Sequence, residues 1–78
     1  MLILYVKDYC PFSTRAMNAA KELEIALDIR NIKEKQFEHE LLQKGGKLET
    51  PYLVDEANNV AMYESSDIIS YLINQTIS

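Results

Sequence analysis

Residues 2–13 have the sequence LILYVKDYCPFS. The run Leu2–Val6 is too short for a helix and is apolar at every position, which is typical of a central strand buried on both faces. Pro11 suits the first turn of a helix, because its missing N–H would be unpaired there in any case. The sequence therefore predicts a strand over Leu2–Val6, a helix that begins at Pro11, and Cys10 at the junction between them.

Working outward from this junction, the first helix carries an apolar stripe and is expected to end near Glu24. The stripe consists of Ala16, Ala20, Leu23 and Leu27. Residues 26–32 then alternate, with Leu27 and Ile29 on one side and charged residues on the other, which predicts a half-buried peripheral strand. Residues 34–44 form a polar helical pattern that stops at Gly45 and Gly46, where a left-handed cap is easiest to form.

The last third of the chain predicts a hairpin followed by a helix. Residues 51–54 and 60–63 flank a polar five-residue connection, of the length that joins antiparallel strands. Ser65, Ser66 and Asp67 precede apolar residues at helical spacing and predict a capped amphipathic helix that runs almost to the C-terminus. The apolar residues of this helix are Ile68, Ile69, Leu72 and Ile73.

The element order is βαβαββα, which predicts an α/β fold with a four-stranded mixed sheet flanked by helices. The first two strands must be parallel and joined by a right-handed crossover, while the hairpin extends the same sheet. We expect one domain over residues 1–78, because a chain of this length has a single core.

Composition excludes several classes of function. The chain has 12 acidic and 8 basic residues and a net charge of -4, and its basic residues are scattered, which argues against nucleic-acid binding. No apolar run approaches the roughly 20 residues of a membrane span, so we expect a cytoplasmic protein with no membrane partner. A single cysteine can neither close an intrachain disulfide nor build a zinc ribbon.

Cys10 is the candidate reactive group. The free N–H groups and the positive dipole end of the predicted helix point toward its sulfur, which would lower the thiol pKa to about 7 and make the thiolate abundant at neutral pH. The alternative is an inert, buried small side chain, because free cysteine is among the most buried residue types. The strand-to-helix position favours reactivity, since open sheets place their sites at such loops.

Three motifs carry a resemblance to known families. Cys10-Pro11-Phe12-Ser13 resembles the active-site motif of glutaredoxins, with serine in place of the usual second cysteine. Thr50-Pro51 resembles the cis-proline segment of thioredoxin-fold proteins. The stretch MYESSDIISYL at residues 62–72 is similar to the glutathione-binding stretch of glutathione transferase N-terminal domains. The resemblance covers essentially the whole chain and implies the thioredoxin-like, glutaredoxin version of the predicted fold.

The resemblance also implies a glutathione site. Thr50, before the cis-proline Pro51, would offer its backbone N–H and C=O to the cysteinyl part of glutathione. Ser65 and Ser66 would hold the γ-glutamyl carboxylate at a helix N-terminus, although these residues are also an ordinary helix cap. Either Glu64 or Asp67 would face the ammonium group of the ligand.

Two further residues have open roles. Lys7 is either a solvated surface lysine or the cation for the glycyl carboxylate. Phe12 either packs beside the ligand or only contacts the start of the helix, and glutaredoxins more often have tyrosine there.

Ser13 determines the kind of reaction that the resemblance implies. A serine hydroxyl can hydrogen-bond the Cys10 thiolate but cannot form a disulfide, so a second glutathione must regenerate the enzyme. The leading hypothesis is a monomeric, monothiol glutaredoxin-like oxidoreductase that uses glutathione as co-substrate and acts on glutathionylated or disulfide-bonded proteins. Whether Ser13 is native or engineered stays open.

Two alternatives come from other functional classes. A pair of chains with two glutathiones could carry a [2Fe-2S] cluster, although cluster-carrying members commonly have glycine where this chain has Pro11. The chain could instead be a stand-alone or truncated N-terminal domain of a glutathione-transferase-like protein, because Glu64-Ser65 is closer to that branch. Such transferases have a separate helical domain that 78 residues cannot contain.

The remaining candidate residues have ordinary explanations. His39 lies between Glu38 and Glu40 on a polar helix and is expected to be solvated, so no metal site is predicted. The five tyrosines are expected in the core and at its rim, and Tyr9 is close enough in sequence to line the thiol site.

Overall fold

A computed structural model describes residues 2–77 as a four-stranded sheet with three helices. The elements are β1 (Leu2–Val6), α1 (Pro11–Glu22), β2 (Asp28–Asn31), α2 (Lys35–Gly45), β3 (Tyr52–Asp55), β4 (Val60–Met62) and α3 (Ser65–Ile77). This order confirms the predicted βαβαββα pattern and the α/β fold of the thioredoxin-like type. Element ends differ by up to two residues from the predicted ones.

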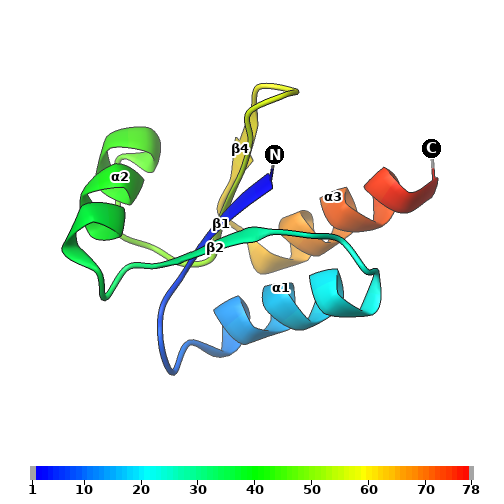
Figure 1. The fold of residues 1–78 in the computed structure, drawn as a ribbon, viewed down its shortest axis with the longest axis horizontal. Helices are drawn as coiled ribbons and strands as arrows, with labels where there is room; N and C mark the ends of the chain where they lie inside the picture. The colour runs from blue at the N-terminus through cyan, green and yellow to red at the C-terminus, as the bar shows by residue number, and fades with distance from the viewer. Residues whose placement is uncertain (1, 78) are drawn as a thin grey trace.

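The sheet has the strand order β2-β1-β3-β4, so β1 lies in its interior. β1 pairs with β2 in parallel and with β3 in antiparallel, and β4 completes the hairpin at the far edge. In Figure 1, α1 and α3 run side by side across one face of the sheet, while α2 lies on the opposite side. The central position explains why Ile3, Leu4, Tyr5 and Val6 are all buried.

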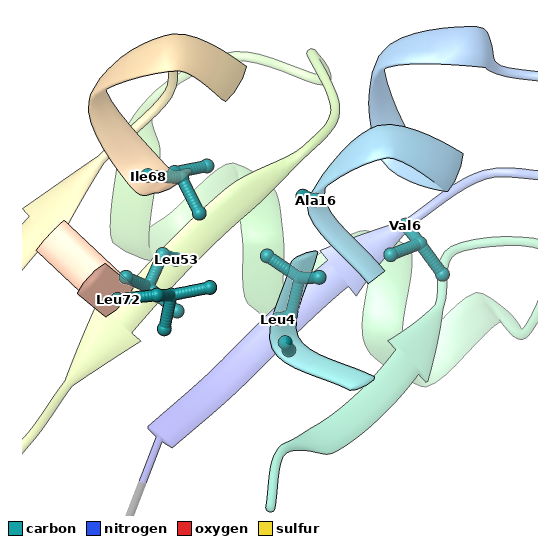
Figure 2. Close-up of a cluster of buried hydrophobic side chains, with 7 residues drawn as sticks. Leu4, Val6, Ala16, Leu53, Ile68 and Leu72 are labelled. Carbon is teal, nitrogen blue, oxygen red and sulfur yellow. The ribbon is translucent and has the colours of Figure 1, made fainter. Parts of the chain in front are cut away.

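The larger apolar cluster lies between the sheet and the α1–α3 layer. Its buried residues are Leu4, Val6, Ala16, Ala20, Leu53, Ile68 and Leu72, most of which appear in Figure 2. Alanine at positions 16 and 20 lets α1 approach the sheet closely, as the predicted stripe requires. Ile73, which the sequence placed in the same apolar set, is instead 41% exposed because it lies on the outer side of α3.

A second cluster forms on the α2 face from alternate residues of the same strands. It contains Ile3, Tyr5, Ile32, Leu41, Tyr52 and Val54. Glu40 of α2 is tied to this face, because the Tyr5 hydroxyl donates to Glu40 Oε1 at 2.8 Å and Arg30 approaches the same oxygen at 2.6 Å. Apolar packing and one shared carboxylate therefore hold α2 against the sheet.

The edge strand β2 departs from the expected burial. Ile29, expected on the apolar side of this strand together with Leu27, is 44% exposed, because β2 is the outermost strand on its side of the sheet. Arg30, expected on the solvent side, is instead half-buried over the rings of Tyr5 and Phe37. The expected peripheral, half-buried strand is confirmed, but Ile29 and Arg30 show the reverse of the burial that the alternation implies.

The two glycines have different tasks. Gly46 caps α2 in the left-handed region at φ 84°, as expected from the sequence. Gly45 is required for another reason: a β-carbon at this position would overlap the side-chain hydroxyl of Tyr63. That hydroxyl donates to the Lys47 carbonyl at 2.8 Å, so Tyr63 packs directly against the end of α2.

The exposure of His39 and the lengths of the helices bear on two expectations from the sequence. His39 is exposed on α2, as predicted. No helix within residues 2–77 is both long and apolar enough to span a membrane.

Leu72 and Ile73 provide a direct test of the packing of α3. We expect Leu72→Ala to lower the free energy of unfolding by about 2–5 kcal/mol, because it removes a fully buried side chain from the larger cluster. Ile73→Ala should change it by less than about 1 kcal/mol, because this position is exposed. Urea denaturation followed by circular dichroism measures both, and equal losses would contradict the assigned core.

Candidate functional site

Cys10 is positioned by the turn from β1 into α1. It is the N-cap residue of α1, with an extended backbone, and its carbonyl accepts from the N–H of Thr14 at 3.1 Å. Pro11 occupies the first helical position, which confirms the predicted helix start. The N–H groups of Phe12 and Ser13 therefore have no partner within the helix and can donate to the Cys10 sulfur.

Thr50 lies beside the same sulfur, although it is forty residues away in sequence. The Thr50 hydroxyl donates to Cys10 Sγ at 3.5 Å, and Sγ lies 3.8 Å from the Thr50 carbonyl oxygen. The Thr50–Pro51 peptide bond is cis, as the resemblance implied. The antiparallel pairing of Tyr5 with Tyr52 explains this contact, because it brings the chain before β3 next to the chain after β1.

Ser13 is completely buried next to the thiol. Its hydroxyl oxygen accepts from the backbone N–H of Lys7 at 3.4 Å, which leaves the hydroxyl hydrogen free to point at another acceptor. The Cys10 sulfur is such an acceptor, and Ser13 is the main source of the hydrogen bonding that favours the thiolate.

These contacts decide the ionisation of Cys10. Partial burial opposes the charged form, but hydrogen bonds from the Ser13 and Thr50 side chains and from the N–H groups of Ser13 and Phe12 outweigh it. Together they lower the pKa of the Cys10 thiol from its ordinary value of 9.0 to about 7. Roughly half of the molecules then carry a thiolate at neutral pH, which is the protonation state required for nucleophilic attack.

A pocket of about 200 Å³ opens next to the thiol. It is lined by Phe12, Glu49, Thr50, Pro51, Tyr63, Glu64 and Ser65. Five of the residues singled out from the sequence thus share one pocket, and Cys10 touches its wall through Thr50.

The start of α3 forms one end of this pocket. The Glu64 carbonyl accepts from the Ile68 N–H at 2.8 Å, so the N–H groups of the three residues between them have no helical partner. Ser65 is buried and lines the pocket, while Ser66 and Asp67 are exposed on the first turn. The two serines belong to the first turn of the helix rather than preceding it, and the free N–H groups suit a carboxylate.

Three of the predicted glutathione-binding residues lie outside the pocket lining. The structure places Ser66 and Asp67 beside it on α3, and of the two acidic candidates for the ammonium group only Glu64 lines it. The Lys7 side chain is exposed on the loop after β1, whereas the Lys7 backbone N–H donates to the Ser13 hydroxyl. Their roles toward a ligand stay predictions.

The sequence did not single out Tyr63 and Glu49, although each precedes a residue that it did. The ring of Tyr63 packs against that of Tyr52 in a tilted arrangement with centroids 4.3 Å apart, and the Lys47 ammonium lies 4.7 Å from the Tyr63 ring centre. Lys47 also pairs with Glu49 at 3.2 Å. The pocket wall is therefore built partly from the chain that follows α2.

Tyr9 differs from the other tyrosines. Tyr5 and Tyr52 are buried and Tyr63 and Tyr71 are half-buried, as expected for core and rim residues. Tyr9 is fully exposed and does not belong to the pocket lining, so the expectation that it lines the thiol site is not met. Within residues 2–77, no group of three or more histidine, cysteine or acidic side chains is arranged to hold a metal ion.

Comparison with protein families gives one match. The model of the family described as glutathione S-transferase, N-terminal domain, matches residues 4–76. No curated protein sequence matches the chain.

Solved structures with the same fold are numerous. An unclassified glutathione S-transferase from Bombyx mori is 28% identical, with a TM-score of 0.81 over 96% of this chain and 35% of that one. A trimeric glutathione transferase from Leishmania is 30% identical, with a TM-score of 0.77 over 96% of this chain and 18% of that one. Ure2p in complex with glutathione is 20% identical, with a TM-score of 0.78 over 96% and 35%. The chain thus spans about a third or less of the length of these proteins.

The hydrogen bond from Thr50 to Cys10 can be tested by the reactivity of the thiol. We expect Thr50→Val to raise the midpoint of the pH dependence of Cys10 alkylation by about one pH unit, because a donor to the thiolate is lost. Alkylation by iodoacetamide, followed by mass spectrometry, gives the midpoint, which should be about 7 in the unchanged chain. Thr14→Val is the matched control, because its hydroxyl contacts the Cys10 carbonyl rather than the sulfur. A midpoint that stays unchanged in Thr50→Val would show that this hydroxyl has no part in the ionisation.

Proposed function

The chain belongs to the family of glutathione S-transferase N-terminal domains, and from this we propose that it binds glutathione and uses Cys10 to exchange glutathionyl disulfides. The motifs in the sequence had left this family open as an alternative to a free-standing glutaredoxin. To the glutathione binding that this family suggests, we add the reaction expected of a single cysteine, Cys10, that is partly ionised at neutral pH. The observation that carries it is the contact of Cys10 Sγ with Thr50, which lines the adjoining pocket.

Glutathione fits the chemistry of this pocket. Its cysteinyl amide would pair with the Thr50 backbone, which places the glutathionyl sulfur beside Cys10. Its γ-glutamyl carboxylate would accept from the free N–H groups and the Ser65 hydroxyl at the start of α3. Its ammonium group would face Glu64 in the same pocket.

The reaction is a sequence of two thiol–disulfide exchanges. The Cys10 thiolate attacks the glutathionyl sulfur of a mixed disulfide, the substrate sulfur leaves with the electron pair, and it takes a proton from water. A second glutathione thiolate then attacks the glutathionyl sulfur now bound to Cys10, releasing glutathione disulfide and the Cys10 thiolate. One added glutathione is consumed per turnover: its thiolate supplies the electron pair that reduces the substrate sulfur, and it leaves as glutathione disulfide together with the glutathionyl group from the substrate.

Ser13 and Thr50 favour both halves of this cycle. Their hydrogen bonds stabilise the negative charge on Cys10, first as the attacking thiolate and later as the leaving group. Because Ser13 cannot attack the mixed disulfide, the intermediate persists until an external thiol arrives.

Carrying a [2Fe-2S] cluster and conjugating glutathione to electrophiles are the two other candidate functions. The [2Fe-2S] carrier stays an untested hypothesis, and no observation in the described part of the chain favours it. Conjugation of glutathione to electrophiles is a second activity that the family name supports, but the relatives with solved structures are about three times as long or longer. The cytoplasmic location, the monomeric state and the single domain over residues 1–78 stay predictions from the sequence.

The exchange reaction predicts a clear dependence on one atom. With the mixed disulfide of glutathione and mercaptoethanol as substrate, turnover coupled to glutathione reductase should be lost in Cys10→Ser. In the unchanged chain the turnover rate should increase with pH as Cys10 ionises, with the midpoint of the increase at about pH 7. Ser13→Ala should remain active but with its midpoint shifted to higher pH, because only a hydrogen bond is lost. Turnover that survives in Cys10→Ser, or an inactive unchanged chain, would refute the proposed function.

The carboxylate site makes a separate prediction about binding. Ser65→Ala should weaken glutathione binding roughly fivefold, the effect of losing one hydrogen bond of about 1 kcal/mol. Ser70→Ala, at an exposed position further along α3, should bind as the unchanged chain does. Titration followed by NMR measures both affinities, and equal affinities would place the carboxylate elsewhere.

A further inference from the structure

Tyr9 combines two unfavourable properties that are not found together elsewhere among residues 2–77. Its side chain is 102% exposed, which leaves an aromatic ring entirely in water. Its backbone has φ 59°, in the left-handed region that costs a residue with a β-carbon about 1–2 kcal/mol. Glycine or asparagine would make the same turn with less strain.

The other residues with positive φ show that the turn alone does not explain a tyrosine. Asn59, in the β3–β4 turn, is of a type that adopts this conformation readily. Glu24 follows the end of α1, where a left-handed residue is common, and its side chain is polar and solvated. Only at position 9 does a strained backbone present a large aromatic ring.

The loop that carries Tyr9 is fixed on both sides. Before it, the Asn31 side-chain Nδ2 donates to Asp8 Oδ1 at 2.8 Å, while the side-chain Oδ1 of Asn31 accepts from the Lys33 backbone N–H at 3.0 Å. After it, Cys10 is fixed by Thr50 and by the helix. Hydrogen bonds therefore hold the residues on both sides of Tyr9, and its exposed side chain belongs to the residue directly before the thiol.

The ring lies outside the proposed glutathione pocket. Phe12, two residues after the thiol, lines that pocket, whereas Tyr9, one residue before the thiol, does not. A mixed disulfide brings two groups to Cys10, glutathione and the chain whose sulfur leaves. Since glutathione would occupy the pocket, the group available to the exposed ring is the leaving chain.

We propose that Tyr9 is a specificity-determining contact for a polypeptide substrate, packing its exposed ring on apolar side chains that flank the glutathionylated cysteine. The proposal rests on the proposed function and assigns Tyr9 a role in recognising the polypeptide that carries the glutathionyl group. Tyrosine suits this role because it provides a large amphipathic surface with few rotatable bonds. A small leaving thiol such as mercaptoethanol lacks the side chains that the ring would contact.

The test compares Tyr9→Asn with the unchanged chain on two mixed disulfides of glutathione. One carries mercaptoethanol, and the other a short synthetic peptide whose single cysteine lies between leucine residues. Asparagine keeps the left-handed turn without the ring. We expect kcat/KM for the peptide to fall about fivefold to tenfold, corresponding to roughly 1 kcal/mol or more of lost contact, and that for mercaptoethanol to stay unchanged.

Two controls separate the ring from the fold. Tyr9→Phe should keep the preference for the peptide, and Leu48→Ala, another exposed apolar residue, should not alter it. Equal losses on both substrates in Tyr9→Asn would assign Tyr9 a structural role only, and an unchanged peptide rate would overturn the proposal outright.

A second measurement works without glutathione and so separates this proposal from the proposed function. Cys10 is alkylated either with iodoacetamide or with the same leucine-flanked peptide carrying an iodoacetyl group in place of its thiol. Because both reagents react with the same thiolate, the ratio of their rates cancels any change in the Cys10 pKa. Tyr9→Asn should lower the rate with the peptide relative to iodoacetamide by a similar factor, even if the chain proves inactive toward mixed disulfides. An unchanged ratio would refute the contact.

Discussion

The antiparallel pairing of β1 with β3 is the constraint on which the site depends. Tyr5 lies opposite Tyr52 and Leu4 opposite Leu53, so the end of one strand is adjacent to the beginning of the other. Cys10 follows the first strand and Thr50 precedes the second, and their contact is a consequence of this register. A slip of one residue would turn the side chains of one of the two strands to the opposite face of the sheet, which would break up both apolar clusters.

The chemistry of Cys10 then comes from short-range hydrogen bonds rather than from charged neighbours. Ser13 is buried and already accepts a backbone hydrogen bond from Lys7, so its hydrogen is directed to the sulfur. Thr50 and the first N–H groups of α1 add to the same effect, and burial of the thiol is the opposing influence. The thiolate is therefore stabilised by groups that the fold itself holds in place.

Much of this arrangement could be predicted from the sequence where local rules coincide with the tertiary structure. Pro11 marks the start of α1, Gly46 marks the end of α2, and the doubly apolar Leu2–Val6 marks an interior strand. The cis peptide at Pro51 and the pocket residue Ser65 followed only from the resemblance, because common turns and caps have the same composition. Ile29 and Tyr63 depend on which neighbour covers them, a long-range property that residue patterns do not contain.

The burial of Ser13 has an evolutionary consequence. Serine and cysteine differ in one side-chain atom, oxygen in place of sulfur, and the site at position 13 already accepts a small, fully enclosed side chain. Replacing that oxygen with sulfur would keep the shape of the side chain, although the larger sulfur atom must fit into the same enclosed space. A cycle that needs a second glutathione and a cycle that a second cysteine could close within the chain therefore differ by a single side-chain atom at position 13 of this fold.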